Sequence, residues 1–255
     1  MAKKKSVNVA NAELKNFVKL FEKLRYRHSA ITVYDDFIAM SAIALSNSVN
    51  FNQERENEYL HIIQKYSKDE QEVFVDLFAE LVMQMQKDAE GTPRYRDVLG
   101  ELFQALGLND EWKGQFFTPQ CVSDLMGEVI GFDKLEELIS ERGYATVLEP
   151  CVGGGSLILG LINAMFAEGF NPCKQLLVTA YDLDIRCVHM AYTQLSLVGV
   201  PAIIQQRNSL SGKAYSDYWF TPMFVMDGWV RKSNSGNVLT EGDEKNKKAG
   251  QLSLF

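Results

Sequence analysis

The amino-terminal part of the chain is patterned for helices. Apolar residues recur at helical spacing from Leu14 to Leu24, and a second apolar segment covers residues 37–45. The capping box Ser67-Lys-Asp-Glu70 opens a third stripe, which runs over residues 73–85. Gly91-Thr-Pro93 then interrupts the pattern. We therefore expect a helical bundle over residues 1–92.

The second half alternates strand-like and helix-like patterns. The run Ala145-Thr-Val-Leu148, a second apolar run ending at Asp182 and a third beginning at Ile203 are separated by spans that suit crossover helices. A helical segment from Asp97 to Leu106 precedes them. The predicted fold class is α/β, with an N-terminal helical domain followed by a partial Rossmann-like sheet within residues 93–231.

A glycine loop ends the first of these strands. The sequence Glu149-Pro-Cys-Val-Gly-Gly-Gly155 leads from the strand into a helical pattern, and a glycine backbone lets a ligand approach closely. Taken alone, such a turn is also common where only packing requires it. Gln115-Phe-Phe-Thr-Pro119 precedes the loop, however, and Asp182 follows it. In this order the three segments resemble the N6-adenine DNA methyltransferase family, in particular the modification subunit of type I restriction systems.

The resemblance implies a site for S-adenosylmethionine. In the family, the Phe-Thr-Pro segment closes over the methionine part of the cofactor beside the glycine loop. The acid after the second strand accepts both ribose hydroxyls, and an Asp or Asn after the third lies beside the adenine ring. Here Ser156 stands where a final glycine is usual. The cofactor-binding residues that the resemblance implies are Phe117, Thr118, Pro119, Glu149, Gly153, Gly155, Asp182 and Asn208.

The family's catalytic motif is degenerate in this chain. N6-adenine methyltransferases carry Asn or Asp, two prolines and an aromatic residue after the fourth strand, and these hold the target amino group and stack on the extruded base. The matching segment here is Thr221-Pro-Met-Phe224, so the resemblance implies Thr221, Pro222 and Phe224 as catalytic residues. A hydroxyl thus replaces the expected amide or carboxylate, and Met223 replaces the second proline.

Two function classes follow. In the first, the chain is an S-adenosylmethionine-dependent adenine methyltransferase that acts on DNA. In the second, it is a catalytically inactive relative that regulates replication or another enzyme, with a phage or mobile element as a reasonable source. The residues after Trp229 are mostly polar, so three further strands of a complete enzyme have no place. Either a partner subunit completes the sheet, or the domain is kept for binding alone.

The carboxyl-terminal residues carry a separate signal. Residues 232–250 are almost entirely polar, which predicts a flexible linker. The final residues, 251–255, resemble the peptide by which bacterial polymerases and repair proteins bind the β sliding clamp. The clamp-binding residues implied are Gln251, Leu252, Leu254 and Phe255. The alternative is that these apolar side chains fold back onto the parent domain.

Composition sets outer limits. The 255 residues carry a formal net charge of −7, which disfavours broad non-specific DNA binding. Lys15, Lys19, Lys23, Arg25, Arg27 and the tail from Lys3 to Lys5 are candidates for a local DNA-binding patch, and a solvated helix face with a tag-like tail is the alternative. No stretch is long or apolar enough to span a bilayer and no signal peptide is recognised, so we expect a cytoplasmic protein.

The cysteines and histidines show no metal-ligand pattern. The three histidines are scattered, and the cysteines have no paired spacing. We therefore expect reduced thiols in the protein interior and no metal site. The four cysteines are Cys121, Cys151, Cys173 and Cys187.

Overall fold

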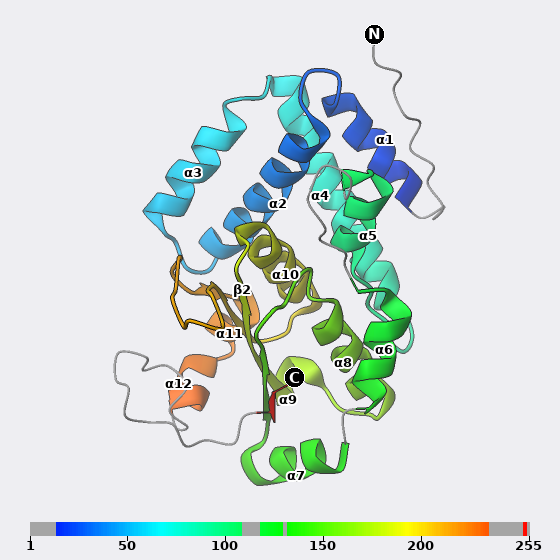
Figure 1. Cartoon of the computed structure of the whole chain (residues 1–255), viewed down its shortest axis with the longest axis vertical. Helices are drawn as coiled ribbons and strands as arrows, with labels where there is room; N and C mark the ends of the chain where they lie inside the picture. The colour runs from blue at the N-terminus through cyan, green and yellow to red at the C-terminus, as the bar shows by residue number, and fades with distance from the viewer. Residues whose placement is uncertain (1–13, 109–117, 130–131, 235–251, 254–255) are drawn as a thin grey trace.

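The structure is a computed structural model that describes residues 14–108, 118–129, 132–234 and 252–253 (Figure 1). The helices of the first half are α1 (Lys15–Leu24), α2 (Ala30–Asn47), α3 (Gln53–Ile63), α4 (Lys68–Asp88), α5 (Val98–Ala105), α6 (Gln120–Val129) and α7 (Phe132–Arg142). The elements that follow are β1 (Ala145–Glu149), α8 (Ser156–Ala167), α9 (Pro172–Gln175), β2 (Leu176–Asp182), α10 (Ile185–Val198), β3 (Ala202–Gln206), β4 (Trp219–Phe220), α11 (Pro222–Met226), α12 (Trp229–Asn234) and β5 (Leu252–Ser253).

The predicted α/β fold class is confirmed. Strands β1, β2 and β3 are parallel neighbours, and helices α8 and α10 lie between them in sequence. Over the described residues the sheet has the order β4-β3-β2-β1-β5. Because the strands are parallel, Glu149 and Asp182 end β1 and β2 at the same edge of the sheet. That edge is where α/β proteins of this kind bind ligands.

The helical half forms as the periodicity predicts. The stripe from Leu14 to Leu24 is buried, and the Ser67–Glu70 capping box opens α4 with both of its hydrogen bonds present. Helix α2 begins at Ser29, whose hydroxyl accepts from the Thr32 amide. The structure adds α3, which the sequence analysis did not predict, because only Arg55 and Ile62 are buried along it.

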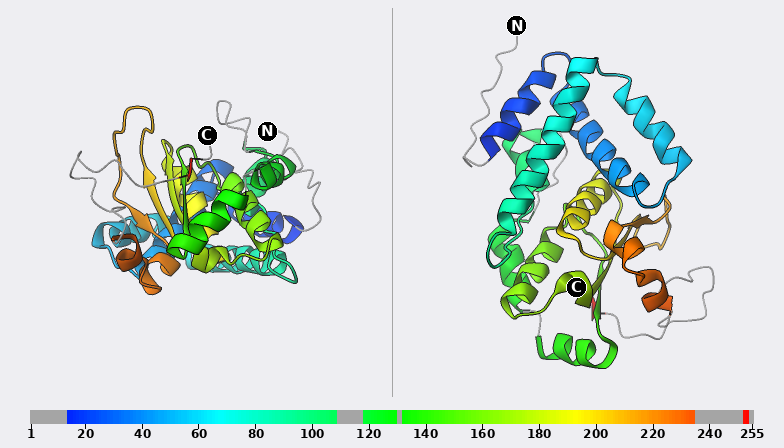
Figure 2. Two further views of the ribbon diagram at one scale, coloured as in Figure 1. Left: turned by 90° about the horizontal axis from the view of Figure 1, so that it is seen from below. Right: turned by 180° about the vertical axis from the view of Figure 1, so that it is seen from behind.

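The two faces of the sheet bury different residues, as the alternation of side chains along a strand requires. Val178 and Ala180 of β2 join the main core, which continues into the helical half without a break. Leu177 faces the other way and packs with Ile203, Phe224 and Trp229 beneath α11 and α12. Figure 2 shows helices on both sides of the strands.

The two outer strands lie at opposite edges of the sheet. β4 pairs antiparallel with β3, at the opposite edge from β1. The place beside β1 is instead taken by β5, where Leu252 and Ser253 run parallel to Val147 and Leu148. Leu252 and Ser253 therefore contact the domain through their backbone, and Leu254 and Phe255 lie outside the described residues.

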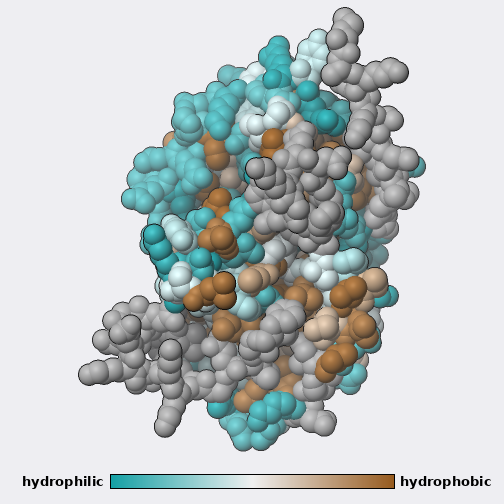
Figure 3. Space-filling model, in the orientation of Figure 1, coloured by the Kyte–Doolittle hydropathy of each residue, from teal (hydrophilic) through white to brown (hydrophobic). Residues whose placement is uncertain are grey.

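The surface divides by hydropathy. Figure 3 shows mostly hydrophilic residues over the upper helices and hydrophobic patches over the lower half. On α6, Val122, Leu125 and Val129 form an exposed apolar stripe. Among the described helices, none combines the length and the apolar character that crossing a bilayer would demand.

The prediction of interior thiols holds only in part. Cys187 is buried and Cys173 is half-buried, whereas Cys121 and Cys151 are exposed. Cys151 lies in the turn after β1, where the chain leaves the sheet and no element covers its side chain. All four cysteines are free thiols.

Candidate functional site

The glycine loop joins β1 to α8 at the carboxyl edge of the sheet. The Val152 amide donates to the Tyr181 oxygen at 2.9 Å, which ties the loop to the end of β2. Gly155 caps α8 with φ of 96°, a conformation that residues with a side chain rarely adopt. Gly153 also has positive φ, at 54°. The loop therefore follows a path that depends on its glycines.

Asp182 organises this edge. Its Oδ2 accepts from the Gly153 amide and its Oδ1 from the Asp184 amide, both at 2.9 Å. A carboxylate has about four acceptor positions, so these two bonds leave capacity for further donors. Burial raises the pKa of Asp182, the backbone amides of Asp184, Gly153 and Leu183 oppose that shift, and the charge of Asp184 adds to it. The side chain is half-buried and so remains within reach of a ligand.

Glu149 lies beneath the same loop and is only 1% exposed. Its Oε1 accepts from the Cys151 amide at 2.9 Å, while Oε2 has no hydrogen-bond partner within the described part of the chain. Burial raises the pKa of this carboxyl, and the charge of Asp182 raises it further. A buried oxygen without a donor is uncommon in folded proteins and points to a donor supplied from outside.

Asp97 is a functional candidate that the sequence analysis missed. It caps α5 by accepting from the Gly100 amide at 2.7 Å, and it is 5% exposed. The Gln194 side chain donates both to Asp97 Oδ1 at 2.8 Å and to the Gly154 oxygen at 2.7 Å. Asp97 Oδ2 has no partner among the described residues. The sequence analysis placed Asp97 at the first position of a predicted helix, and no sequence pattern linked it to the loop.

Helices α6 and α8 bring the Phe-Thr-Pro segment toward the loop. Gly160 of α8 lies against the Ser123 main chain, and Gly127 of α6 lies against Gly160, with no room for a Cβ at either glycine. Thr118 and Pro119 come immediately before α6 and are half-buried and exposed respectively. Phe117 lies outside the described residues.

Asn208 follows β3 but is engaged in a turn. Its Oδ1 accepts from the Leu210 and Ser211 amides, both at 3.0 Å. Its amide nitrogen has no hydrogen-bond partner in the described part of the structure and remains available as a donor. The next residue, Ser209, donates its hydroxyl to the Pro150 oxygen, so this turn reaches across the end of β2 to the glycine loop.

The three predicted catalytic residues are not brought to this edge. Thr221 follows β4 at the amino end of β3, where its hydroxyl donates to the Val200 oxygen and accepts from the Ala202 amide, both at 2.8 Å. Phe224 is fully buried and stacks on Phe220, with ring centroids 5.1 Å apart. Pro222 borders a separate cavity of about 320 Å³. They lie there because β4, which precedes them, pairs antiparallel with β3.

The other predicted sites are only partly described. Leu252 lies in β5, and Gln251, Leu254 and Phe255 lie outside the described residues. Lys15, Lys19 and Lys23 are exposed along α1, whereas Arg25 is paired with Glu22. Within the described residues, no three His, Cys, Asp or Glu side chains are grouped to hold a metal ion.

The chain is similar to solved structures but matches no family model or curated sequence. Three chains of solved structures match, and two of these structures each have a TM-score of 0.36. One is a Listeria monocytogenes protein regarded as a class I S-adenosylmethionine-dependent methyltransferase, at 16% identity over 71% of this chain and 56% of that one. The other is the methyltransferase subunit of a type I restriction-modification system from Streptococcus thermophilus, at 14% identity over 80% and 60% respectively.

This chain thus spans little more than half the length of either structure.

Proposed function

We propose that the chain binds S-adenosylmethionine at the carboxyl ends of β1 and β2, between the glycine loop and Asp182. The observation that carries this proposal is the set of acidic groups around one loop. Asp182 has spare acceptor capacity for ribose hydroxyls, and Glu149 Oε2 is buried without a donor. The amino group of a methionine moiety is a donor of the kind that Glu149 lacks.

The residues fit the cofactor in further respects. Gly153 and Gly155 supply the left-handed backbone, Thr118 and Pro119 precede α6 beside α8, and Asn208 keeps its amide nitrogen for an adenine ring. Phe117 would complete the methionine side. The bound cofactor would supply a methyl group on a positively charged sulfur. The protein's part is to hold the ribose and the amino group.

Of the two function classes, we favour the inactive relative. Thr221 and Phe224 are buried at the amino end of β3, and their hydroxyl and ring already have partners in the protein. Neither group is positioned to hold an adenine amino group or to stack on an extruded base. We therefore assign this chain a binding or regulatory role in a DNA adenine-N6 methylation or replication context, without methyl transfer of its own.

Two partners accompany this proposal. A partner subunit that completes the methyltransferase sheet would supply the missing motif, and the apolar stripe of α6 is a surface that it could cover. DNA is the expected substrate of such an assembly, with Lys15, Lys19 and Lys23 as basic residues able to meet phosphates.

The second partner is the β sliding clamp, through residues 251–255. In this structure Leu252 and Ser253 pair with β1, so clamp binding requires that β5 leave the sheet. An edge pairing of two residues is short enough to be exchanged for a partner surface. Tethering to the clamp would then depend on the balance between these two positions of the tail.

The decisive experiment is a calorimetric titration of the full chain with S-adenosylmethionine. Asp182→Ala should weaken binding by about 1–3 kcal/mol, the usual cost of unpaired buried hydrogen-bond partners. Asp76→Ala, which removes an exposed carboxylate from α4, serves as the charge-matched control. No binding by the parent protein, or equal binding by Asp182→Ala, would exclude the proposed site. A methyl-transfer assay on unmethylated DNA should give no incorporation with the chain alone.

A further inference from the structure

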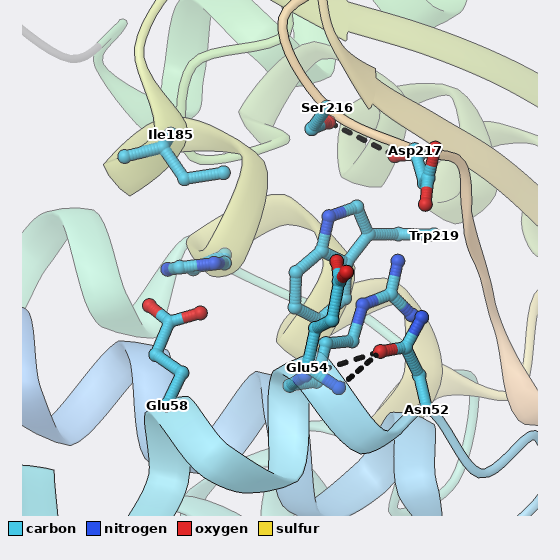
Figure 4. Close-up of a pocket in the computed structure, with 9 residues that line it drawn as sticks. Asn52, Glu54, Glu58, Ile185, Ser216, Asp217 and Trp219 are labelled. Carbon is cyan, nitrogen blue, oxygen red and sulfur yellow. Dashed lines mark hydrogen bonds between the residues drawn. The ribbon is translucent and has the colours of Figure 1, made fainter. Parts of the chain in front are cut away.

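A second cavity lies away from the glycine loop, between the helical half and the sheet. Its volume is about 210 Å³, and its walls come from α3, the start of α10 and the segment that enters β4 (Figure 4). None of the residues assigned above to the cofactor lines it. At roughly 30 Å³ per water molecule, the cavity has room for one ring system with a short substituent.

The floor of the cavity is aromatic and rigid. Trp219 is 3% exposed, and the Arg55 guanidinium lies over its ring at 3.7 Å from the centroid. That guanidinium is itself held, because it donates to Ser46 Oγ at 2.7 Å and to the Tyr218 oxygen at 2.9 Å. The ring of His189 meets Trp219 edge-on, with centroids 5.0 Å apart. A flat ligand would therefore meet a floor that is already formed.

Two polar groups at this floor are held by ring contacts and not by hydrogen bonds with described residues. His189 is 4% exposed, and among the described residues the ring contacts of His189 and Trp219 are with each other and with the Tyr192 ring and the Arg55 guanidinium. Figure 4 shows the indole nitrogen on the side of Trp219 that faces Ile185 and Ser216. Burial and the charge of Arg55 lower the pKa of His189 to about 3, so its ring is neutral near pH 7. The floor thus offers an indole donor and a neutral imidazole.

The rim of the cavity is acidic. Glu54 and Glu58 stand four residues apart on α3 and extend toward the cavity, and Asp217 closes it from the opposite wall (Figure 4). All three carboxylates are exposed, and Arg55 is the cation among the lining residues. The net charge of the lining is therefore negative. Such a rim attracts an ammonium group and repels a phosphate or carboxylate.

We propose that this cavity binds a small heteroaromatic amine. Its ring would lie against Ile185 and Trp219, a ring nitrogen would accept from the Trp219 indole, and its ammonium group would face Glu58 and Asp217. The polar floor groups select a ring that carries nitrogen, and the acidic rim selects a positive charge. Nucleotides and other anions are excluded by the same carboxylates.

Three matched probes test the proposal: 2-(pyridin-2-yl)ethylamine, phenethylamine, which lacks the ring nitrogen, and pyridine-2-acetate, which replaces the amine by an anion. The readout is the indole N–H signal in a nitrogen-resolved NMR titration of the full chain. The protein has three tryptophans, so Trp219→Phe identifies the signal by its loss. We expect that signal to move with the pyridyl amine, to move several-fold less readily with phenethylamine, and to stay in place with the anion.

Two pairs of variants distinguish an effect of the rim carboxylates from an effect of overall charge. The double variant with Glu58→Gln and Asp217→Asn should bind the pyridyl amine roughly threefold to tenfold more weakly, because it loses two partly exposed ion pairs. The control pair, Glu72→Gln and Asp76→Asn, removes two exposed carboxylates from α4 and should leave affinity unchanged. An unmoved Trp219 signal, equal binding of the anion, or equal losses in both variant pairs would overturn the proposal. Each of these readouts is independent of S-adenosylmethionine.

Discussion

The carboxylate of Asp97 lies directly against Gly154, so that a Cβ on Gly154 would come within 2.5 Å of Asp97 Oδ2. The contact joins the start of α5 to the glycine loop of the sheet. Gln194 closes the arrangement by donating to both residues. The loop is therefore shaped by the helix before the sheet as well as by its own glycines.

We expect Gly154→Ala to destabilise the protein by about 1–3 kcal/mol, the usual cost of forcing a side chain into a filled interior. The Asp97 carboxylate cannot turn aside cheaply, because the Gly100 amide and Gln194 hold it. The measurement is urea unfolding of both single variants and the double variant with Asp97→Ala. The double variant should lose less than the sum of the two single losses. Additive losses would show that the two residues act separately.

Glu149 should make stability depend on pH. Its pKa is raised by burial in the folded protein, so its contribution to the free energy of unfolding is fully present below about pH 4. That contribution is lost as pH rises through the higher folded-state value. Glu149→Gln keeps the acceptor for the Cys151 amide and removes the titration. Relative to this variant, the parent protein should therefore become less stable as the pH rises above about 4.

Unfolding measured by denaturant at several pH values checks this expectation. Glu141→Gln, which changes an exposed carboxylate of α7, provides the control and should follow the parent curve. Parallel curves for the parent and Glu149→Gln would contradict a raised pKa at this position.

We expect the hydroxyl of Thr221 to contribute to stability and not to cofactor binding. Thr221→Val removes the hydroxyl that joins the Val200 oxygen to the Ala202 amide, and we expect a loss of about 1–3 kcal/mol for the two groups left unpaired. Thr221→Ser keeps the hydroxyl and should retain most of the stability. Binding of S-adenosylmethionine by the folded fraction should be the same in both variants. A specific loss of cofactor binding in Thr221→Val would indicate that Thr221 belongs to the cofactor site.

The sequence was informative wherever local pattern decides structure. Helix α1 and the capping box of α4 follow from periodicity and cap chemistry, and β1 and β2 follow from apolar runs that end at Glu149 and Asp182. Helix α3 was missed because its sequence is polar on most sides. Local pattern also could not say which edge of the sheet β4 would join.

The residues of the candidate site also differ in whether local sequence pattern predicts them. Glycines and acids at predicted strand ends can be recognised from their spacing, so Gly153, Glu149 and Asp182 were predicted as site residues, and the structure brings them to one edge of the sheet. Asp97 contacts Gly154 of the loop although the two residues are 57 positions apart in the sequence. This contact depends on the packing of the helical half. Thr221 was predicted from a motif match, which carries no information on the strand that β4 pairs with.

The tail should bind in two mutually exclusive ways. Because Leu252 and Ser253 pair with β1, truncation after residue 250 should lower the free energy of unfolding by about 1 kcal/mol, the net worth of one or two backbone hydrogen bonds. The same pairing should weaken clamp binding by the full chain roughly fivefold relative to a free peptide of residues 246–255. Urea unfolding measures the first effect, and competition on immobilised clamp measures the second. Unchanged stability after truncation would contradict the pairing, and a free peptide that does not bind would exclude the clamp as a partner. If the peptide binds and the full chain matches its affinity, the pairing does not restrain the tail, because release of β5 then costs nothing measurable.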